Sequence, residues 1–473
     1  MSSNNKLTFC TGVGTVTGAN FLLDTAVDSR VVGDKSVTGT RLLIDCGLVQ
    51  GEKVALDENS EPFAYDLSSV AALIITHAHL DHVGRIPKLV KDGYHGPIYS
   101  TPETRSLAEL VLNDAVTILR MEAERDGRVP LYTPEDVAKV FPLWKTIPYH
   151  ENFKISDDVS IFLKDAGHIL GSAMVEVTVA GAQGSGGAQK FLFTGDLGNS
   201  PAPLLRDTEP VGDVDYMVME SVYGDRNHES RAERSDKFER IIKQTISRGG
   251  TLVIPTFAID RTQVILYELN NLVENKKIPS VIVYVDSPMA TEATRIYAES
   301  QDLFNDYVKT QIAHGDKPFS FPHLQFTSSQ MQSSNIESNK DAKIILAGSG
   351  MSMGGRVIGH EEFYLPDEKS TILLVGYQMS GSLGRHLVDG EKTVQIHGRP
   401  VHVKATIETI FGFSAHKDSD HLVEFVSTAT PRLKEVFVVM GEPKASMHLA
   451  QRINDEIGKK AIVPERLKVY ELE

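Results

Sequence analysis

The segment ALIITHAHLDHVG runs an apolar stretch directly into a cluster of metal-binding side chains. Residues 71–75 are short, continuous and β-branched at their end, which favours a buried strand, although periodicity alone does not distinguish it from a helix. An extended chain would point His77 and His79 to the same side, and Asp81 and His82 follow where the chain turns. Neutral imidazole and carboxylate are ligands of zinc. The sequence therefore predicts a metal site here, and histidines that merely cap the next helix are the weaker alternative.

The length and composition of the chain limit the number of domains and the class of protein that we expect. At 473 residues the chain is too long for one compact core, so we expect two or three domains. Hydrophobic content of 41% and charged content of 23% are typical of a soluble globular protein. The beginning, MSSNNKLTFC, lacks the apolar core of a signal peptide, and no run is long enough to span a bilayer. We expect a cytoplasmic protein that does not bind membranes.

The cysteines and the net charge restrict the site further. Cys10 and Cys46 are the only cysteines, so no disulfide framework is available and zinc must be held by histidine and carboxylate. The net charge of -15 argues against a broad electrostatic footprint for nucleic acid. It leaves room for a locally basic groove or for acidic ligands that await cations.

The predicted pattern of helices and strands changes twice along the chain. The first 210 residues resemble strands joined by turns, with few helices. From Ser230 onward amphipathic helices alternate with apolar strands such as TLVIPTFA and SVIVYVD, which predicts a parallel α/β sheet. After Gly390 the strands return, followed by a helix, a strand EVFVVM and a last helix. We therefore predict a middle domain at 216–390, inserted between two parts of another domain at 1–215 and 391–473.

Three further candidates follow predicted strands. His168 lies in DAGHILGSAMVEV, Asp196 ends the strand of KFLFTGDLG, and Asp45 ends the strand of RLLIDCG. A carboxylate just past a strand is a common turn former, so each acid alone is a weak signal. Together with the first cluster, however, they supply four histidines and three acids from loops that follow strands. Such a set suits a dinuclear metal site.

These motifs carry a family resemblance. His-x-His-x-Asp-His, the later His168 and the Asp196 of TGD resemble the metallo-β-lactamase superfamily. The middle segment resembles its β-CASP branch, the nucleic-acid nucleases that include the polyadenylation cleavage endonuclease and the RNase J enzymes. VMESVYG, with Glu220, is similar to acidic motif A of that branch, and GFSAHKD, with His416, to motif B. DCGLVQG, GSGMSMGGRV and GYQMSGSLGRHLVDG resemble further family segments, so that the likeness extends from about Thr8 to the final helix.

The resemblance implies a fold and a ligand set. The fold would be α/β, an αββα metallo-β-lactamase sandwich with an inserted parallel-sheet β-CASP domain and the active site in the cleft between them. The implied ligands are His77, His79 and His168 for one zinc ion, Asp81 and His82 for a second, and Asp196 as the bridge. Asp45 would orient metal-bound histidines, as such sites require.

The resemblance also implies a mechanism. Two zinc ions would activate a water and clamp a phosphate oxygen, so Asp81 counts among the catalytic residues as well as among the ligands. His416 is the candidate acid for the leaving 3′ oxygen, and Glu220 would hold and polarise it. Alternatively, Ser414 of SAH caps a helix, which is compatible with catalysis by His416.

Two loops rich in glycine and serine, GSGMSMGG and GYQMSGSLGR, could cradle phosphate with backbone N–H groups. Such turns are usually only turns. By their place in the family segments, Ser349, Ser382, Arg356 and Arg385 are the candidate phosphate- and RNA-binding residues. We expect the chain to bind single-stranded RNA in the interdomain cleft. A homodimer is a further candidate assembly.

One position departs from the family pattern. The branch normally carries a histidine in a His-Gly-Glu motif C, where this chain has Met440 in VVMGEP. A thioether is poorly suited to zinc in an oxygen-rich site, so the second zinc is expected to bind weakly. DNA-repair members carry an aliphatic residue there, but the longer loop segments resemble the RNA-acting group.

The sequence thus predicts a zinc-dependent ribonuclease, an endonuclease with 5′ exonuclease action as a second mode. A DNA nuclease of the same branch is one alternative. A catalytically silent scaffold of an RNA-processing complex is another, which the presence of every metal-ligand candidate in the first motifs disfavours.

Overall fold

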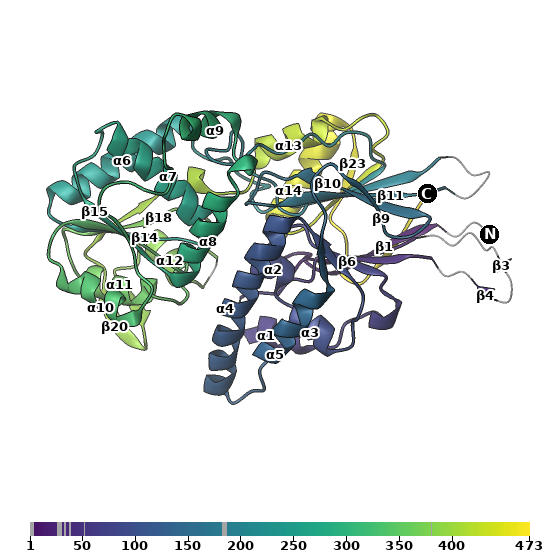
Figure 1. Ribbon diagram of the computed structural model, residues 1–473, viewed down its shortest axis with the longest axis horizontal. Helices are drawn as coiled ribbons and strands as arrows, with labels where there is room; N and C mark the ends of the chain where they lie inside the picture. Colours follow the sequence, from purple (N-terminus) through teal and green to yellow (C-terminus); the bar gives the residue numbers. More distant parts are fainter. Residues whose placement is uncertain are drawn as a thin grey trace. The chain divides into compact units, whose positions relative to one another are not determined.

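The structure is a computed structural model that describes residues 4–25, 31–32, 35–36, 39–51, 53–181, 187–379 and 381–473 (Figure 1). The chain forms two compact units. Unit 1 comprises Met1–Ser200, Asp207–Asn227 and His416–Glu473, and unit 2 comprises Pro201–Arg206 and His228–Ala415.

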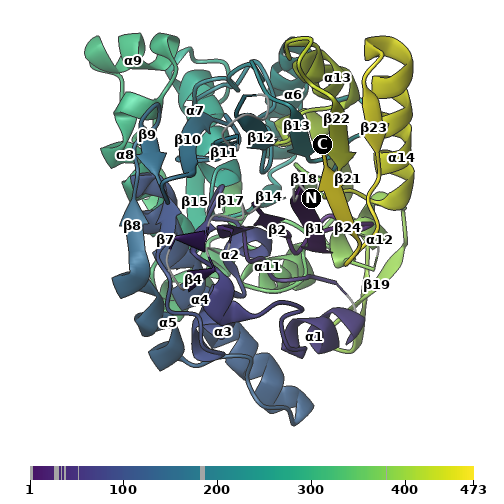
Figure 2. The same cartoon turned by 90° about the vertical axis from the view of Figure 1, so that its right-hand side faces the viewer.

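Unit 1 is built on two mixed sheets of seven strands each (Figure 2). The first has the order β24 (Val469–Leu472), β1 (Asn5–Thr11), β2 (Asn20–Asp24), β5 (Arg41–Ile44), β6 (Ala72–Ile74), β7 (Ile98–Ser100) and β8 (Trp144–Thr146). The second has the order β23 (Lys460–Ile462), β22 (Glu435–Val438), β13 (Tyr216–Met219), β12 (Gln189–Phe193), β11 (Ala173–Val179), β10 (Val159–Asp165) and β9 (Asn152–Lys154). A short pair, β3 (Val31–Val32) and β4 (Lys35–Ser36), stands apart from both.

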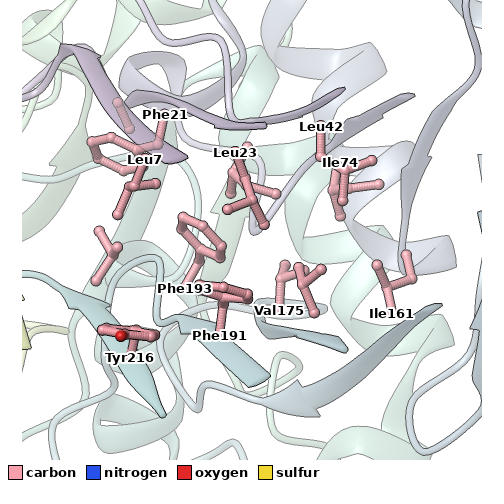
Figure 3. Packing of buried hydrophobic residues seen from close by; sticks show 14 of the residues in the cluster. Leu7, Phe21, Leu23, Leu42, Ile74, Ile161, Val175, Phe191, Phe193 and Tyr216 are labelled. Carbon is pink, nitrogen blue, oxygen red and sulfur yellow. The ribbon is translucent and has the colours of Figure 1, made fainter. Parts of the chain in front are cut away.

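The main core of unit 1 lies between these two sheets (Figure 3). Alternate side chains of a strand point to opposite faces, and the inward ones here are apolar. The first sheet contributes Leu7, Phe21, Leu23, Leu42 and Ile74, and the second contributes Ile161, Val175, Phe191, Phe193 and Tyr216. The partner strands β10 and β11 show the alternation directly, since half-buried residues interrupt their buried ones.

Helices cover the outer faces of both sheets of unit 1. The helices are α1 (Lys53–Ser60), α2 (Leu80–Val83), α3 (Ile86–Lys91), α4 (Pro102–Asp126), α5 (Pro134–Val140), α13 (Ser419–Ser427) and α14 (Pro443–Arg452). Short 3₁₀ turns at Leu67–Ser69 and Phe141–Leu143 and a π turn at Ile453–Ile457 accompany them. Helices α2–α5 lie outside the first sheet, and α13 and α14 pack on the second (Figures 1 and 2). The αββα sandwich expected from the sequence is confirmed.

Unit 2 contains a six-stranded sheet in which every neighbouring pair is parallel. Its order is β16 (Leu324–Phe326), β15 (Ile282–Asp286), β17 (Lys343–Ala347), β14 (Thr251–Pro255), β18 (Thr371–Leu374) and β21 (Thr406–Thr409). Strands β14, β17 and β18 are buried throughout, as expected for parallel strands that are covered on both faces. The predicted parallel α/β insertion is thereby confirmed.

Two helical layers and a hairpin cover the sheet of unit 2. The helices are α6 (Arg231–Ser247), α7 (Arg261–Glu274), α8 (Pro288–Glu299), α9 (Asp306–Ala313), α10 (Gln330–Ser338), α11 (Val357–Tyr364) and α12 (Leu383–Val388), with 3₁₀ turns at Gln301–Leu303 and Phe411–Phe413. Helices α6 and α7 share a core with one face of the sheet, whereas α11, α12 and the hairpin of β19 (Thr393–Ile396) and β20 (Arg399–His402) share a core with the other.

The structure differs from the sequence-based outline at two places. The return to unit 1 falls at His416 and not at residue 391, because β21 pairs with β18 and the β19–β20 hairpin packs on the sheet of unit 2. Strands β23 and β24 follow the helix that we expected to be the last. Both are short edge strands, so they give little periodicity to detect. In the described part of the chain no helix has the length and apolar character to cross a membrane.

Candidate metal centre

The predicted ligands come together in unit 1 because each follows a strand of one of its two sheets. Asp45 follows β5, His77 follows β6, His168 follows β10 and Asp196 follows β12. The remaining members of the first motif are at the start of α2, which has His79 as its N-cap and contains Asp81 and His82. Loops that follow strands of both sheets thus supply the site from a rigid scaffold.

Four side chains form a first group, which consists of His77, His79, His168 and Asp196. Nε2 of His77 lies 3.1 Å from Nδ1 of His79, which lies 3.2 Å from Nε2 of His168. Oδ2 of Asp196 is 3.4 Å from Nε2 of His77 and 3.5 Å from Nε2 of His168. Ligand atoms about 2.0–2.1 Å from a common centre in tetrahedral geometry lie about 3.3 Å apart. These four distances therefore match the spacing of ligand atoms around one zinc ion.

Three side chains form a second group, which consists of Asp81, His82 and Asp196. Nε2 of His82 lies 3.3 Å from Oδ1 of Asp196 and 3.9 Å from Oδ2 of Asp81. Asp196 thus turns one carboxylate oxygen to each group. Nε2 of His82 and Oδ1 of Asp196 are both buried and without a hydrogen-bond partner among the described residues. Buried polar atoms are nearly always satisfied, so this pair fits a bound cation.

A buried network holds His82 in place. Asp45 is fully buried, and its Oδ2 lies 2.7 Å from Nδ1 of His82. The same carboxylate accepts hydrogen bonds of 2.8 Å from the backbone N–H and the hydroxyl of Thr76. This contact leaves Nε2 of His82 for the metal, which is the arrangement that a ligating imidazole needs. We did not identify Thr76 from the sequence, although a polar residue between an apolar strand and His77 was a signal.

The protonation states of the first group suit metal binding. Burial lowers the pKa of His79 and His168 well below the usual value, and neighbouring histidines lower it further. Both imidazoles are therefore neutral at pH 7, the form that binds a cation.

Beside the first group lies a histidine–carboxylate pair. Glu220 follows β13 and is buried, and its Oε1 and Oε2 are both 3.1 Å from Nδ1 of His416. The backbone N–H of Leu197 donates to Oε1 at 2.6 Å, which fixes the carboxylate. Burial disfavours the imidazolium, but the charge of Glu220 and its hydrogen bond outweigh burial and raise the pKa of His416 to about 9. The imidazole ring centroids of His416 and His168 are 4.6 Å apart.

Met440 follows β22 and belongs to the apolar core between the sheets. Its side chain is 2% exposed, and its Sδ lies close enough to Gly12 that a Cβ at Gly12 would be only 2.9 Å away. Its backbone has φ of 48°, a conformation that side chains other than those of Asn and Asp seldom adopt. Among the residues that the structure describes, the second group thus has three imidazole or carboxylate members.

The candidate phosphate-binding residues lie in unit 2. Arg356 directs Nη1 to Oδ1 of the buried Asp286 at 2.7 Å and Nη2 to the carbonyl of Ser328 at 3.3 Å. The same carboxylate accepts hydrogen bonds from Thr327, Ser333 and His360. The guanidinium therefore has a structural partner within its own unit.

The other three candidates also have local contacts. Arg385 pairs with Asp389 through Nε at 2.9 Å on an exposed part of α12. Ser382 caps that helix by accepting from the N–H of Arg385 at 3.1 Å. Ser349 accepts from the N–H of Met353 at 3.0 Å. Their phosphate-binding role remains a prediction.

Comparisons with known proteins agree with this architecture. Three family models match the chain: a metallo-beta-lactamase superfamily domain at residues 36–182, a Beta-Casp domain at 262–387, and a Zn-dependent metallo-hydrolase RNA specificity domain at 400–464. Ribonuclease TTHA0252 of Thermus thermophilus is 35% identical over 87% of this chain and 90% of its own length.

Relatives named transcription termination factor FttA match a similar share of the chain. The transcription termination factor FttA of Methanosarcina mazei is 33% identical over 88% of this chain and 66% of its own length. FttA of Thermococcus kodakarensis is 33% identical over 87% of this chain and 63% of its own length. The chain thus spans about two thirds of the length of these FttA relatives.

The fold, the clustered histidines and aspartates and these matches define a metal-dependent hydrolase. The chain belongs to the β-CASP branch of the metallo-β-lactamase superfamily. The family expected from the sequence is therefore confirmed, as is the metal-dependent class of its chemistry.

Proposed function

We propose that this chain is a zinc-dependent ribonuclease that hydrolyses phosphodiester bonds of RNA in processing or decay. Cleavage is endonucleolytic, with 5′ exonuclease action as a second mode. The observation that carries this proposal is the position of Asp196, whose two oxygens face the two groups of candidate ligands.

Zinc at both groups is supported by the donor set. Only imidazole nitrogen and carboxylate oxygen are offered, in the number and spacing that zinc takes at the first group. His77, His79 and His168 would hold the first ion, Asp81 and His82 the second, and Asp196 both. A pair of bound zinc ions supplies Lewis acidity toward the phosphate and lowers the pKa of water.

The proton for the leaving group would come from His416. Glu220 accepts from Nδ1, which sets the tautomer and directs Nε2 toward the substrate. With its pKa raised to about 9, the imidazole carries a proton at neutral pH. His416 thus holds and delivers a proton to the 3′ oxygen as the bond to phosphorus breaks, and Glu220 stabilises the imidazolium until then.

RNA as substrate is supported by the comparisons. The matched model at 400–464 is described as an RNA specificity domain, and one relative with 90% of its length covered is named a ribonuclease. We retain Ser349, Ser382, Arg356 and Arg385 as proposed contacts to RNA phosphates. A cytoplasmic location and a homodimer are further predictions of this proposal.

The proposal is tested by metal analysis together with a panel of labelled single-stranded RNA and DNA substrates of one sequence. We expect zinc in the purified protein, cleavage of RNA in preference to DNA, and loss of cleavage on chelation that zinc restores. Preferential cleavage of DNA would replace the proposal with a DNA nuclease. Zinc without cleavage of either substrate would instead indicate a silent scaffold.

A further inference from the structure

The loops that leave β14 and β17 lie next to each other, because these two strands are parallel neighbours in the sheet of unit 2. β14 continues through α7 to β15, beyond β17, and β17 continues through α11 to β18, beyond β14, and the two helices share cores with opposite faces of the sheet. In open parallel sheets, ligands bind outside the carboxyl ends of the strands. The topology therefore directs attention to the loops that leave β14 and β17.

An aromatic ring lies in the first of these loops. Phe257 lies two residues after the fully buried strand β14 and is 38% exposed. The hydroxyl of Thr262 at the start of α7 donates to the carbonyl of Phe257 at 2.8 Å, which fixes the backbone there. The ring therefore lies at the carboxyl end of β14, on a turn that this hydrogen bond closes.

The second loop packs against this ring. A Cβ placed on Gly350 would lie 2.6 Å from Cδ2 and 2.8 Å from Cε2 of Phe257, so the glycine backbone touches one side of the ring. The same loop presents Met353, which is 52% exposed. Gly350 therefore covers part of the ring, and Phe257 remains partly exposed beside a loop rich in glycine and serine.

An exposed aromatic ring beside a glycine-rich loop fits the chemistry of a nucleotide. Nucleobases stack on aromatic side chains whatever their sequence, and glycine-rich turns receive phosphate oxygens. Arg356, in the same connection, is already paired with Asp286. Because Arg356 is paired, base stacking on Phe257 is the interaction that would distinguish this loop pair from a general anion site.

We propose that Phe257 is a base-stacking residue that binds one nucleotide of single-stranded RNA at the carboxyl ends of β14 and β17. The proposal rests on the proposed ribonuclease function, since it names a contact that this substrate makes with unit 2. Stacking tolerates any base, so the residue would hold the strand without setting a sequence preference.

The test measures binding of a single-stranded RNA oligonucleotide by the full chain, in a His416→Ala background that suppresses cleavage. We expect Phe257→Ala and Phe257→Leu to weaken binding by about 5- to 100-fold and Phe257→Trp to preserve it. The leucine variant keeps an apolar contact with Gly350, so it carries the test if the alanine variant is unstable. Tyr307→Ala, which removes a 63% exposed ring on α9, is the matched control and should bind normally.

A scan with a single abasic nucleotide makes the test specific for stacking. With Phe257 present, one position of the oligonucleotide should show a loss of affinity when its base is removed. In Phe257→Ala that loss should disappear, and the effect should be the same at low and high salt because no charge is involved. Unchanged affinity of the leucine variant, or an abasic penalty that persists without the ring, would overturn the proposal.

Two further measurements, of mononucleotide binding and of RNA cleavage, distinguish this inference from its alternatives. Tight binding of a free mononucleotide that depends on Phe257, without extra affinity for the oligonucleotide, would show a mononucleotide site and refute the RNA contact. If the unmodified chain cleaves RNA but Phe257→Leu binds it normally, the inference fails and the ribonuclease stands. If the unmodified chain cleaves no RNA, the proposed function itself fails.

Discussion

The two ligand groups of unit 1 share a carboxylate but differ in what else they offer. The first group has three imidazoles and Asp196, with neighbouring ligand atoms 3.1–3.5 Å apart. The second has Asp81, His82 and Asp196, and its spacings reach 3.9 Å. One chain thus holds a set of four candidate ligands beside a set of three. Because both groups contain Asp196, the number of protein ligands, and not the shared carboxylate, should set how tightly each ion is held.

The difference has a structural origin in Met440. The family resemblance places a histidine at this position, but here the side chain packs in the apolar core against Gly12. A thioether is a weak ligand for zinc among oxygen donors. The second ion would therefore depend on water or on substrate to complete its coordination.

Removal of the shared carboxylate of Asp196 should weaken zinc binding at both ligand groups. Because Asp196 contributes to both groups, we expect Asp196→Ala to reduce cleavage to background and to lower zinc content at both. Asp81→Ala should also abolish cleavage but lower the zinc content only partly. Cleavage assays and elemental analysis check this, with the exposed Asp157→Ala as control. Full activity in either ligand variant would contradict a two-metal mechanism.

Removal of the proposed proton donor should lower turnover without changing zinc binding at either ligand group. His416→Ala is expected to lower turnover by about 10²–10⁴-fold, the range for a lost general acid, with unchanged zinc content. A loss of zinc in this variant would make His416 a ligand, and normal turnover would refute its role as the acid.

The pH dependence tests the pair itself. His416 must be protonated to act, and its pKa is about 9, so turnover should fall as the pH rises through about 9. Glu220→Gln removes the charge that raises this pKa, and the alkaline limb should move down by about 1–3 units. A pH–rate profile of both proteins measures the shift. An unmoved limb would mean that Glu220 does not control His416.

Substitution of Asp45, which contacts His82, should lower zinc affinity at the second group only. Asp45→Asn keeps the shape of the side chain but removes the charge that orients His82, so zinc affinity at the second group should fall about 10–100-fold. Competition with a chelator, followed as zinc release, would resolve a weak and a strong phase. Equal weakening of both phases would indicate that Asp45 supports the whole site and not His82 alone.

The sequence was most informative where ligands follow strands. The spacing of His77, His79, Asp81 and His82 was enough to predict a metal site, and the alternation of helix and apolar strand predicted the parallel sheet. The roles of individual ligands came from the family resemblance, because no local pattern brings His168 beside His77 across the sandwich.

Other features depend on contacts that no local pattern encodes. The boundary at His416 follows from the pairing of β21 with β18, which joins segments far apart in the chain. The partnership of Thr76 with Asp45 likewise joins the ends of two neighbouring strands. Arg356 resembled a phosphate clamp in the sequence, but the buried Asp286 that it pairs with could be located only in the fold.

Zinc stoichiometry shows whether Met440 makes the two groups unequal in their affinity for zinc. After dialysis we expect between about one and two zinc ions per chain, rising with added metal. Met440→His should bring the count nearer to two and increase RNA cleavage at limiting zinc. If the unmodified chain already holds two tightly bound ions, or if Met440→His leaves occupancy unchanged and alters only the preference for RNA over DNA, the account of the second group is wrong.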